Sequence, residues 1–415
     1  MLTVARFGGL LSLAVVSVNA QATNGYFTHG TSVKAQGMAG VSVAMAHDSL
    51  SAASNPASLT ALTAEQQLDL GVTYFAPERK SDISGNGFGI DGTYHANDRK
   101  YFLIPELGYA RHHSDVLSYG LALYANGGMN TDYGDNPFAN FGSSGSAGVN
   151  LEQLYVTATL AYRLNDNHSL GLGLTWTRQQ FEAKGLQAFA GMSQDGANIS
   201  NNGKDVSRGW GVKLGWQGDL TDTLKAGLSW SSKIETSEFH RYRGLFAEDG
   251  GFDIPENIAA GLAWQTTDKL TLAADWQYIA YSEVKSVGND LNLVAPLGAD
   301  NGAGFGWDDI NVYKVGAQYR LNSDISLRAG YSYADQPIDS SQTFLNILAP
   351  GVIQEHLSLG SSWQLNDSNE LTLSYTHAFE ETVKGKQSVP AAFGGGESDL
   401  TMSQDLLALG WSVRF

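Results

Sequence analysis

From residue 66 onward, apolar residues alternate with small or polar residues in one segment after another. Leu170, Leu172, Leu174 and Trp176 alternate with Ser, Gly, Gly and Thr, and residues 270–278 repeat the pattern. Successive side chains of a strand point to opposite faces, so each segment predicts a strand with one apolar and one polar face. A soluble sandwich would instead turn a charged face outward. The pattern indicates an all-β transmembrane barrel with an apolar exterior and a polar lumen.

Dividing the pattern predicts a 14-stranded antiparallel barrel. The expected strands are residues 66–77, 99–112, 116–126, 149–163, 168–183, 207–217, 223–238, 255–265, 269–284, 309–320, 324–334, 353–365, 369–383 and 402–415. The connections between them alternate between short turns rich in Asn, Asp and Ser and long loops. Outer-membrane barrels have short periplasmic turns and long external loops, and an even number of strands leaves both termini in the periplasm.

An aromatic residue recurs a few positions before the end of every strand that runs to a short turn or to the C-terminus. These residues are Tyr109, Tyr162, Trp216, Trp264, Tyr319, Trp363 and Trp411. Aromatic rings at one depth form a girdle at a membrane interface. The last strand ends on Phe415, with Trp411 and Val413 on the same face. This ending resembles the signal by which the barrel assembly machinery takes up its substrates.

Residues 23–62 precede the strands and lack their alternation. The segment is rich in Gly and Ala, and its apolar residues follow no 2.0 or 3.6 period. Such a segment cannot form a core alone, but it can pack inside a barrel as a hatch that plugs the lumen. Asn55, Pro56 and Ala57 predict a fixed turn within it, because Pro restricts φ and Asn caps or turns the chain. The alternative is a disordered Gly/Ala-rich leader in which Asn55-Pro56 is an ordinary turn.

Residues 1–22 have the features of a cleaved secretory signal peptide. Arg6 provides the positive charge, an apolar stretch follows, and Ala20-Gln21-Ala22 forms a small-residue cleavage site. No later apolar run approaches the length of a transmembrane helix, which is about 20 residues. We therefore divide the chain into a signal peptide (1–22), a hatch (23–62) and a barrel (63–415), exported to the outer membrane of a Gram-negative cell.

Composition excludes several classes of function. The 415 residues include no Cys and carry a net charge of −17, so neither a thiolate metal site nor a nucleic-acid partner is expected. The catalytic motifs G-x-S-x-G and H-E-x-x-H and the phosphate-binding P-loop are absent from the sequence. We expect no enzymatic activity, no cofactor and no metal.

The sequence resembles the FadL-type long-chain fatty acid transporters, a family of outer-membrane proteins that also includes aromatic-hydrocarbon importers. The resemblance covers the whole mature chain and is most specific in the hatch, at Asn24-Gly25-Tyr26-Phe27, at residues 37–40 and at Asp48 to Asn55-Pro56-Ala57. Further matches lie at residues 119–121, 127–131, 254–257, 275–278 and 328–333, with Pro337. The resemblance implies a fourteen-stranded barrel with an N-terminal hatch, and it favours the plug over the disordered leader.

The resemblance also implies passive transport of a hydrophobic ligand. In the family, a groove between two external loops captures the ligand, which then passes to an apolar pocket above the hatch. A shift of the hatch releases it through a side opening at an inward kink of the third strand. By this analogy the opening is expected near Gly120, Gly127 and Gly128, because Gly lets a strand bend out of its ladder.

Apolar residues in two external loops are candidates for the groove. They are Phe138 and Phe141 in one loop and Leu186, Phe189 and Met192 in the other, where a short helix is expected. An exposed apolar cluster of this kind usually marks a binding surface. The alternative is that these side chains pack on one another and close the top of the barrel.

Inside the barrel, Phe27, Met38, Val41 and Met45 of the hatch are the candidate pocket residues. The alternation points three cations into the lumen, where a fatty carboxylate could bind, namely Lys213, Lys314 and Arg328. Asp275 and Glu106 are candidate counter-charges. The alternative is a structural ion-pair network between hatch and wall, since buried charges are costly without partners.

The favoured function is a monomeric importer of hydrophobic compounds, above all long-chain fatty acids, in contact with outer-membrane lipid and lipopolysaccharide. An importer of aromatic hydrocarbons or alkanes and a non-selective porin remain alternatives. A barrel enzyme or adhesin is the third class considered.

Overall fold

The computed structural model describes residues 24–291 and 293–415. The expected signal peptide (1–22) lies outside these residues. The strands are β1 (Gln66–Ser84), β2 (Gly92–His95), β3 (Phe102–His112), β4 (Leu117–Asn130), β5 (Gly148–Arg163), β6 (His168–Lys184), β7 (Asp205–Asp219), β8 (Leu224–Ser231), β9 (Asn257–Gln265), β10 (Leu270–Ile279), β11 (Ile310–Arg320), β12 (Ile325–Ala334), β13 (Glu355–Asn366), β14 (Asn369–Val383) and β15 (Glu397–Arg414).

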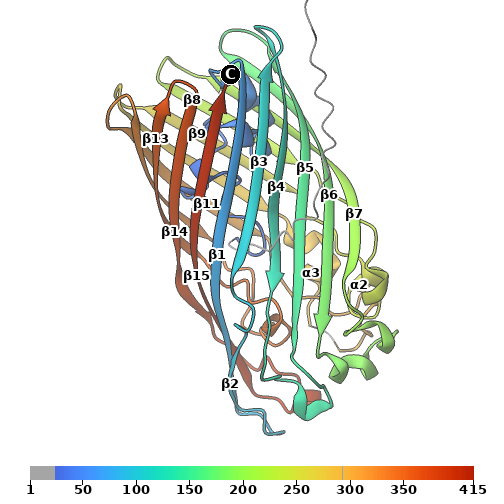
Figure 1. Cartoon of the computed structure of the whole chain (residues 1–415). Coiled ribbons are helices and arrows are strands. Elements are labelled where there is room, and N and C mark those ends of the chain that lie inside the picture. The colour runs from blue at the N-terminus through green and yellow to red at the C-terminus, as the bar shows by residue number, and fades with distance from the viewer. Residues whose placement is uncertain (1–23, 292) are drawn as a thin grey trace, which may run out of the picture.

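The strands form one antiparallel sheet that closes on itself (Figure 1). Each strand from β3 to β15 pairs with its neighbour in sequence, β3 pairs with β1, and β15 pairs back onto β1 from Arg414 to Glu397. Strand β2 pairs only with β1, at residues 92–95. The described strands other than β2 therefore make a closed barrel of fourteen, which confirms the predicted fold class.

The two faces of the wall differ as the alternation predicted. On β6, Leu170, Leu172 and Leu174 are 45%, 50% and 49% exposed, whereas Thr175 and Thr177 are buried. The expected aromatic girdle lies on this outward face, where Trp264 and Trp411 are 52% and 47% exposed. Apolar side chains exposed in the middle of paired strands are suited to lipid, and polar side chains buried inside a closed sheet face the lumen.

Several strand boundaries differ from those expected. Strand β1 runs seven residues further than residues 66–77, to Ser84, because the extended first external loop folds back as β2. The strand expected at 223–238 ends at Ser231, and the one expected at 269–284 ends at Ile279. After Ile279 the chain forms the 3₁₀ helix η7 (Tyr281–Glu283) and buries Tyr281 completely.

The helices are short. They are α1 (Val33–Gln36), η1 (Ser49–Ala53), η2 (Pro56–Ala61), η3 (Ala139–Phe141), η4 (Gln187–Met192), η5 (Gly196–Asn198), η6 (His240–Tyr242), α2 (Ala247–Gly250), η7, α3 (Lys285–Gly288), η8 (Leu345–Ile347) and η9 (Ala391–Phe393). Among the described residues, none of these helices has the length and apolarity to cross a bilayer.

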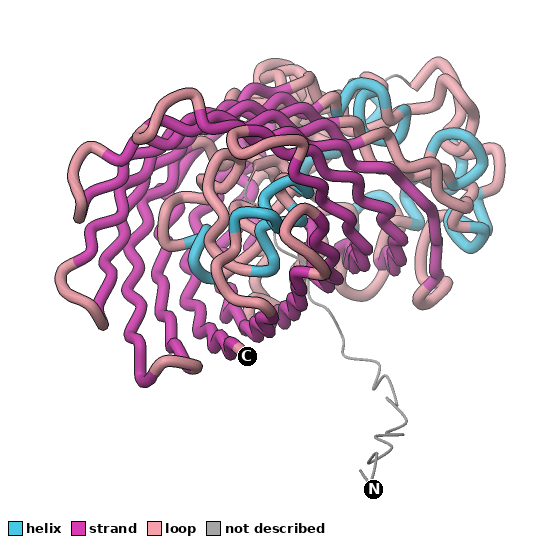
Figure 2. Tube along the Cα trace, turned by 90° about the horizontal axis from the view of Figure 1, so that it is seen from above, coloured by secondary structure: helices cyan, strands magenta, loops and turns pink. Residues whose placement is uncertain are grey.

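The segment from Asn24 to Leu62 lies within the ring of strands (Figure 2). Its helix α1 contacts β13, β14 and β15, and its helix η2 contacts β5, β6 and β7 on the other side of the ring. A segment that touches both walls crosses the lumen between them. We call residues 24–62 the hatch from here on.

Candidate functional site

Inward-facing carboxylates of the wall hold the hatch by its backbone. Glu106 Oε1 accepts a hydrogen bond from the Val33 N–H at 2.9 Å. Asp275 Oδ2 accepts from two successive N–H groups, those of Ser42 and Val43, at 2.7 and 2.9 Å. Glu106 and Asp275 therefore anchor the hatch to the wall, in addition to any role as counter-charges.

A third anchor, Asp69 on β1, was missed at the sequence level. Its Oδ2 accepts from the N–H of Ser49 at 2.8 Å and from the Ser49 hydroxyl at 2.5 Å. The signal was available, because Asp69 occupies a position between Leu68 and Leu70 where the lumen face is expected. An ionisable residue at a lumen position of a barrel strand is a candidate partner for whatever fills the lumen.

The Asn55-Pro56-Ala57 turn is fixed as the sequence predicted. Asn55 caps η2, its side chain accepting from the Ala57 N–H at 3.1 Å, and Pro56 is the first helical residue. The Asn55 amide also donates to two carbonyl oxygens, Val43 O at 2.8 Å and Trp216 O at 2.9 Å. One fully buried side chain thus joins two parts of the hatch and the wall.

Three of the four expected hatch pocket residues pack against the wall. Met38 and Val41 are fully buried in a cluster with Ala263 and Ala273, and Met45 packs against this cluster. None of these three residues lines the cavity that contains Lys213 and Lys314. Phe27 differs, because it lines a small cavity between the hatch and the wall.

The three expected cations are separated by the structure. Lys213 and Lys314 line the same cavity as Phe27, together with Asp275. Lys213 Nζ donates to the carbonyl oxygen of Ala53, and Lys314 Nζ donates to that of His29 at 3.4 Å. No ion pair in the described chain includes either lysine. Asp275 is paired with Lys314 across the β10–β11 ladder, but the two side chains form no salt bridge, and Asp275 Oδ2 accepts instead from the hatch backbone.

Arg328 lies elsewhere on the wall. It donates to Gln318 Oε1 at 2.9 Å and to the Ser362 hydroxyl at 2.6 Å, and it does not line the cavity that contains Lys213 and Lys314. The ion pair that does join the hatch to the wall is Lys34 with Glu370, at 2.6 Å.

The imidazole of His29 is buried between the hatch and the wall. Its ring stacks on that of His356 with 4.4 Å between centroids, and its Nε2 lies 3.3 Å from the Ser358 hydroxyl. Burial lowers the pKa of His29 well below its ordinary value, and the neighbouring His356 and Lys314 lower it further. The hatch is therefore docked with His29 uncharged.

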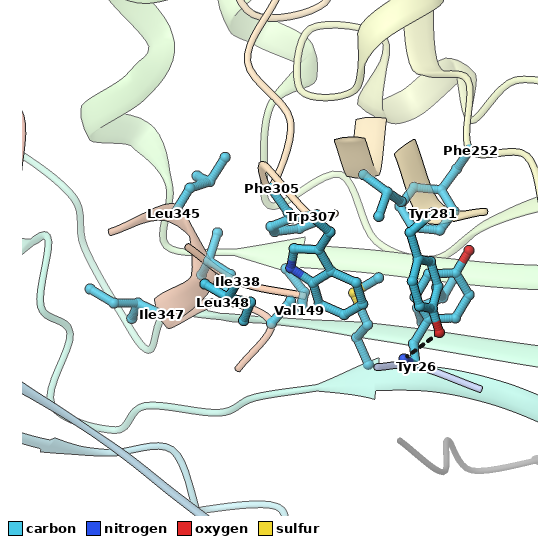
Figure 3. Close-up of a cluster of buried hydrophobic side chains, with 14 of the residues drawn as sticks. Tyr26, Val149, Phe252, Tyr281, Phe305, Trp307, Ile338, Leu345, Ile347 and Leu348 are labelled. Carbon is cyan, nitrogen blue, oxygen red and sulfur yellow. Dashed lines mark hydrogen bonds between the residues drawn. The ribbon is translucent and has the colours of Figure 1, made fainter. Parts of the chain in front are cut away.

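An aromatic cluster formed by Tyr26, Phe27, Phe252, Tyr281 and Trp307 lies where the start of the hatch meets the long loops. Figure 3 shows Tyr26, Phe252, Tyr281 and Trp307 of this cluster. The Tyr281 hydroxyl holds the start of the hatch, donating to Asn24 O at 2.5 Å and accepting from the N–H groups of Tyr26 and Phe27 at 3.2 and 3.3 Å. The rings of Tyr281 and Trp307 are perpendicular, with 5.2 Å between centroids. The first residues of the hatch are thus part of the apolar interior above it.

A small, mostly apolar cavity adjoins this cluster. Tyr26 and Trp307 line one side, Phe75 and Met402 contribute from β1 and β15, and Arg79 is its cation. A concave apolar surface with few polar groups is typical of a site for a small hydrophobic ligand.

The ladder between β3 and β4 is incomplete beside this cavity. Strand β3 pairs with β1 from Phe102 to Arg111, but its pairing with β4 begins only at Leu107. In the described chain, no ladder pair joins residues 102–106 of β3 to residues 124–130 of β4. Strand β4 has a register shift between Ala125 and Gly127 at this level. The barrel wall is thus interrupted between β3 and β4, toward the end of these strands that faces the long loops.

The hatch contacts β4 at its register shift. Gly127 forms an isolated bridge with Phe27, and the Gly128 N–H donates to Tyr26 O at 3.0 Å. A side chain at residue 127 would overlap the Tyr26 carbonyl, so only Gly fits. Gly120 does not belong to the interruption, because it pairs with Ala110 and Thr159 in the regular ladder. Its lack of a side chain instead makes room for Leu59 of the hatch.

A buried apolar cluster fills the interruption. It consists of Phe75, Phe102, Ile104, Ala125 and Leu406, with Leu154 packed against it. Pro105 is the sequence signal that was missed here. Pro has no N–H to give to a ladder and is found in sheets at edges, and β3 has an edge at this level.

The external-loop residues are brought together but are not exposed. Phe138, Leu186 and Phe189 are at most 2% exposed, and Phe138 and Phe189 meet edge to face with 5.0 Å between centroids. Phe141 and Met192 pack against the same cluster, which also includes Phe344 and Phe393. The expectation of an exposed cluster is wrong, since the loops pack on one another as the alternative held. The expected short helix is present as η4.

The model of one family, described as outer membrane protein transport protein (OMPP1/FadL/TodX), matches residues 13–415. The chain belongs to this family. As a member with a closed barrel, it is an outer-membrane protein of the Gram-negative type.

Curated relatives from the family are distant in sequence but similar in extent. The long-chain fatty acid transport protein of Escherichia coli K12 is 21% identical over 387 residues, covering 82% of this chain and 84% of that protein. The long-chain fatty acid transport protein of Salmonella typhi is 22% identical over 378 residues, with 82% and 84% covered.

Solved structures have the same fold. A Pseudomonas aeruginosa FadL homologue superposes with a TM-score of 0.74 at 19% identity, covering 94% of this chain and 100% of the other. The Pseudomonas putida toluene transporter TodX superposes with a TM-score of 0.69 at 18% identity, with 93% and 99% covered. Relatives that transport fatty acids and relatives that transport toluene are thus similarly distant from this chain.

Proposed function

We propose that this protein is a passive importer of hydrophobic compounds that releases its ligand sideways, through the interruption between β3 and β4, into the outer leaflet. The proposal rests on one observation above all. The ladder is missing where an apolar cavity inside the barrel meets the wall, and apolar side chains fill the space. The relatives whose names mention a fatty acid or toluene support a hydrophobic ligand.

The physical reason for a lateral route is the cost of exposing an apolar chain to water. Each CH₂ moved from an apolar surface into water costs about 0.8 kcal/mol. A long alkyl chain that crossed an aqueous pore would lose most of its favourable burial. A path from the cavity past Phe75, Phe102 and Ile104 keeps the ligand in contact with apolar side chains until it reaches lipid.

The hatch blocks the route straight through the lumen to the periplasm in this account. It contacts opposite walls and is held by backbone hydrogen bonds to Asp69, Glu106 and Asp275. The same hatch controls the lateral route, because Phe27 and Tyr26 contact the bend of β4 at Gly127 and Gly128. A small shift at the start of the hatch would therefore change the width of the interruption.

The cluster around Phe138 and Phe189 serves as the external capture site in this account. The loops that form it are packed before the ligand arrives, so a ligand would have to separate the rings of Phe138, Phe189 and Phe344. Phe and Met side chains adapt to apolar ligands of varied shape.

Uptake in a deletion strain tests the proposal. Cells that lack their own transporter and express this chain should accumulate radiolabelled oleate faster than cells with an empty vector. Rescue of growth on toluene without oleate uptake would reassign the ligand to aromatic hydrocarbons. In planar bilayers the purified protein should conduct few ions, and stable currents of porin size would contradict the plugged barrel.

A further inference from the structure

Two arginines lie directly opposite each other on adjacent strands of the wall. Arg178 of β6 is paired with Arg208 of β7 in the ladder, and Figure 1 shows these two strands side by side. Arg178 continues the alternation of the exposed Leu172 and Leu174, so both arginines belong to the outer face of the barrel. Residues directly opposite in an antiparallel ladder have Cβ atoms about 5 Å apart, and like charges there repel. An anion shared by the two guanidinium groups would remove this repulsion.

The two guanidinium groups are left with most of their donors free. One terminal nitrogen of Arg178 donates to Gln180 Oε1 at 3.2 Å. Arg208 donates through its backbone N–H to the Ser237 hydroxyl at 3.2 Å, but its side chain has no hydrogen-bond or ion-pair partner among the described residues. Each guanidinium has five N–H donors in a planar fork, so the pair can bind several oxygens of one anion.

Acids near the pair do not neutralise it. Glu182, further along the outer face of β6, lies 3.9 Å from Lys184. Glu235 lies on the segment that runs beside β7 and forms no ion pair in the described part of the chain. On β1, by contrast, the outward Lys80 lies 3.1 Å from its own acid, Asp82. The two arginines therefore differ from a solvated face on which charges of opposite sign alternate.

The height of the pair in the membrane indicates the kind of anion. Trp176 and Trp210 are paired across the same two strands, two residues closer to the short turns, and Trp210 is 62% exposed. Tryptophan rings gather where acyl chains give way to headgroups, and arginine side chains reach from an apolar surface toward water. Beyond Arg178, β6 continues to Lys184 and one of the long external loops. The two guanidinium groups therefore lie at the level of the lipid headgroups of the outer leaflet.

We propose that Arg178 and Arg208 together bind a phosphate group of lipopolysaccharide, the phosphorylated glycolipid of the outer leaflet. A guanidinium matches phosphate oxygens with two parallel N–H donors, and two such groups opposite each other can hold one phosphate between them. The acyl chains of the same lipid lie along the apolar outer face that includes Trp176 and Leu174. Strand β5 separates this site from β4, so a bound lipid leaves the interruption between β3 and β4 open. The assignment is independent of the proposed function, because it concerns the outer face of the wall and not the lumen.

Binding of a lipid with and without its phosphates tests the assignment. The purified protein in nonionic detergent is titrated with lipid A, the phosphorylated anchor of lipopolysaccharide, and with lipid A whose phosphates have been removed. Native mass spectrometry resolves the free and the lipid-bound barrel and so measures both affinities. The wild type should bind lipid A at least tenfold more tightly than the dephosphorylated lipid. The double variant Arg178→Gln/Arg208→Gln should lose this preference and bind both lipids as the wild type binds the dephosphorylated one.

A second double variant controls for the loss of two positive charges. Lys269→Gln/Arg320→Gln removes two exposed cations at a short turn, on the opposite rim of the barrel, and should keep the preference of the wild type. Thermal unfolding supplies an independent measurement. Without lipid, Arg208→Gln should melt at the temperature of the wild type or above it, because one of two opposed charges is gone. Lipid A should raise the melting temperature of the wild type but not that of Arg178→Gln/Arg208→Gln.

Inorganic phosphate distinguishes a lipid headgroup from a free anion. At the concentration of lipid A it should leave the lipid complex intact, because it lacks acyl chains to pack on the wall. Displacement of the lipid by equimolar phosphate would overturn the lipid assignment. Equal affinity of the wild type for the two lipids, or an undiminished preference in the folded variant Arg178→Gln/Arg208→Gln, would overturn it as well. Neither result would affect the proposal of hydrophobic transport through the lumen.

Discussion

Asn55 holds the hatch in place, and replacing it by Ala should loosen the hatch by an amount that the structure allows to be calculated. The substitution removes three hydrogen bonds, from the Ala57 N–H at 3.1 Å and to Val43 O and Trp216 O at 2.8 and 2.9 Å. Each is worth about 1 kcal/mol net, so we expect the docked hatch to lose about 3 kcal/mol. At 1.4 kcal/mol per factor of ten, the undocked fraction rises roughly 100-fold.

Cysteine labelling measures this fraction directly, because the chain has no Cys. Ser58 is a suitable reporter, since it is fully buried and its hydroxyl has no partner in the described chain, so that Ser58→Cys removes no hydrogen bond. A soluble maleimide can react with this cysteine only when the hatch opens locally. The rate of labelling should therefore follow the undocked fraction, provided that closing is faster than labelling.

The expected result is that Asn55→Ala in the Ser58→Cys background is labelled about 100-fold faster than its parent. Asn167→Ala provides the matched control, because Asn167 is an exposed residue of a short turn, and its substitution should leave the rate unchanged. A labelling rate for Asn55→Ala within twofold of the parent would refute the reasoning, because the three hydrogen bonds would then contribute nothing to docking.

Three other predictions follow from the contacts of the hatch. Gly127→Val places side-chain atoms on the Tyr26 carbonyl and should displace the start of the hatch, which limited proteolysis would detect as faster cleavage there. An unchanged cleavage rate would show that β4 moves and the hatch does not. Asp275→Ala leaves two hatch N–H groups without their acceptor and should loosen the hatch, which would raise ion conductance in planar bilayers. Conductance equal to that of the wild type would show that Asp275 does not hold the hatch in place. Because burial lowers the pKa of His29, the neutral imidazole stabilises the fold above about pH 6.5, and this stabilisation is lost as the pH falls toward the pKa of the folded state. The melting temperature should therefore fall less steeply with decreasing pH in His29→Gln than in the wild type. Equal pH dependence of the two melting temperatures would contradict this prediction.

The barrel could be predicted from the sequence because its determinants are local. Alternation along segments such as residues 170–176 specifies two faces, and turn residues mark the ends of strands, so the number of strands follows without distant contacts. The boundaries of β8 and β10 could not be predicted in this way. Strand β10 ends where Tyr281 turns inward to bind Asn24, more than 250 residues away.

The site was less predictable because it depends on which lumen residues meet the hatch. Alternation turns Lys213, Lys314 and Arg328 inward, but it contains no information on the depth of each side chain in the barrel or on its partner. It therefore cannot show that Arg328 lies away from the cavity that the two lysines line. Arg79 lies on β1 in a stretch that the expected strand, 66–77, did not reach. Arg79 is therefore absent from the predicted lumen residues because the predicted strand ends before the observed end of β1.

Closing the interruption between β3 and β4 tests the lateral route most directly. Ile104→Cys on β3 and Ala125→Cys on β4 place two thiols in one buried cluster at the interruption, where a short bismaleimide can join them. A matched pair, Thr382→Cys and Thr401→Cys, joins β14 to β15, where the two hydroxyls lie 2.9 Å apart. The barrel crosslinked at 104 and 125 should bind oleate but fail to deliver it to cells, while the barrel crosslinked at 382 and 401 should deliver it normally. Full delivery with the interruption crosslinked to completion would contradict the account.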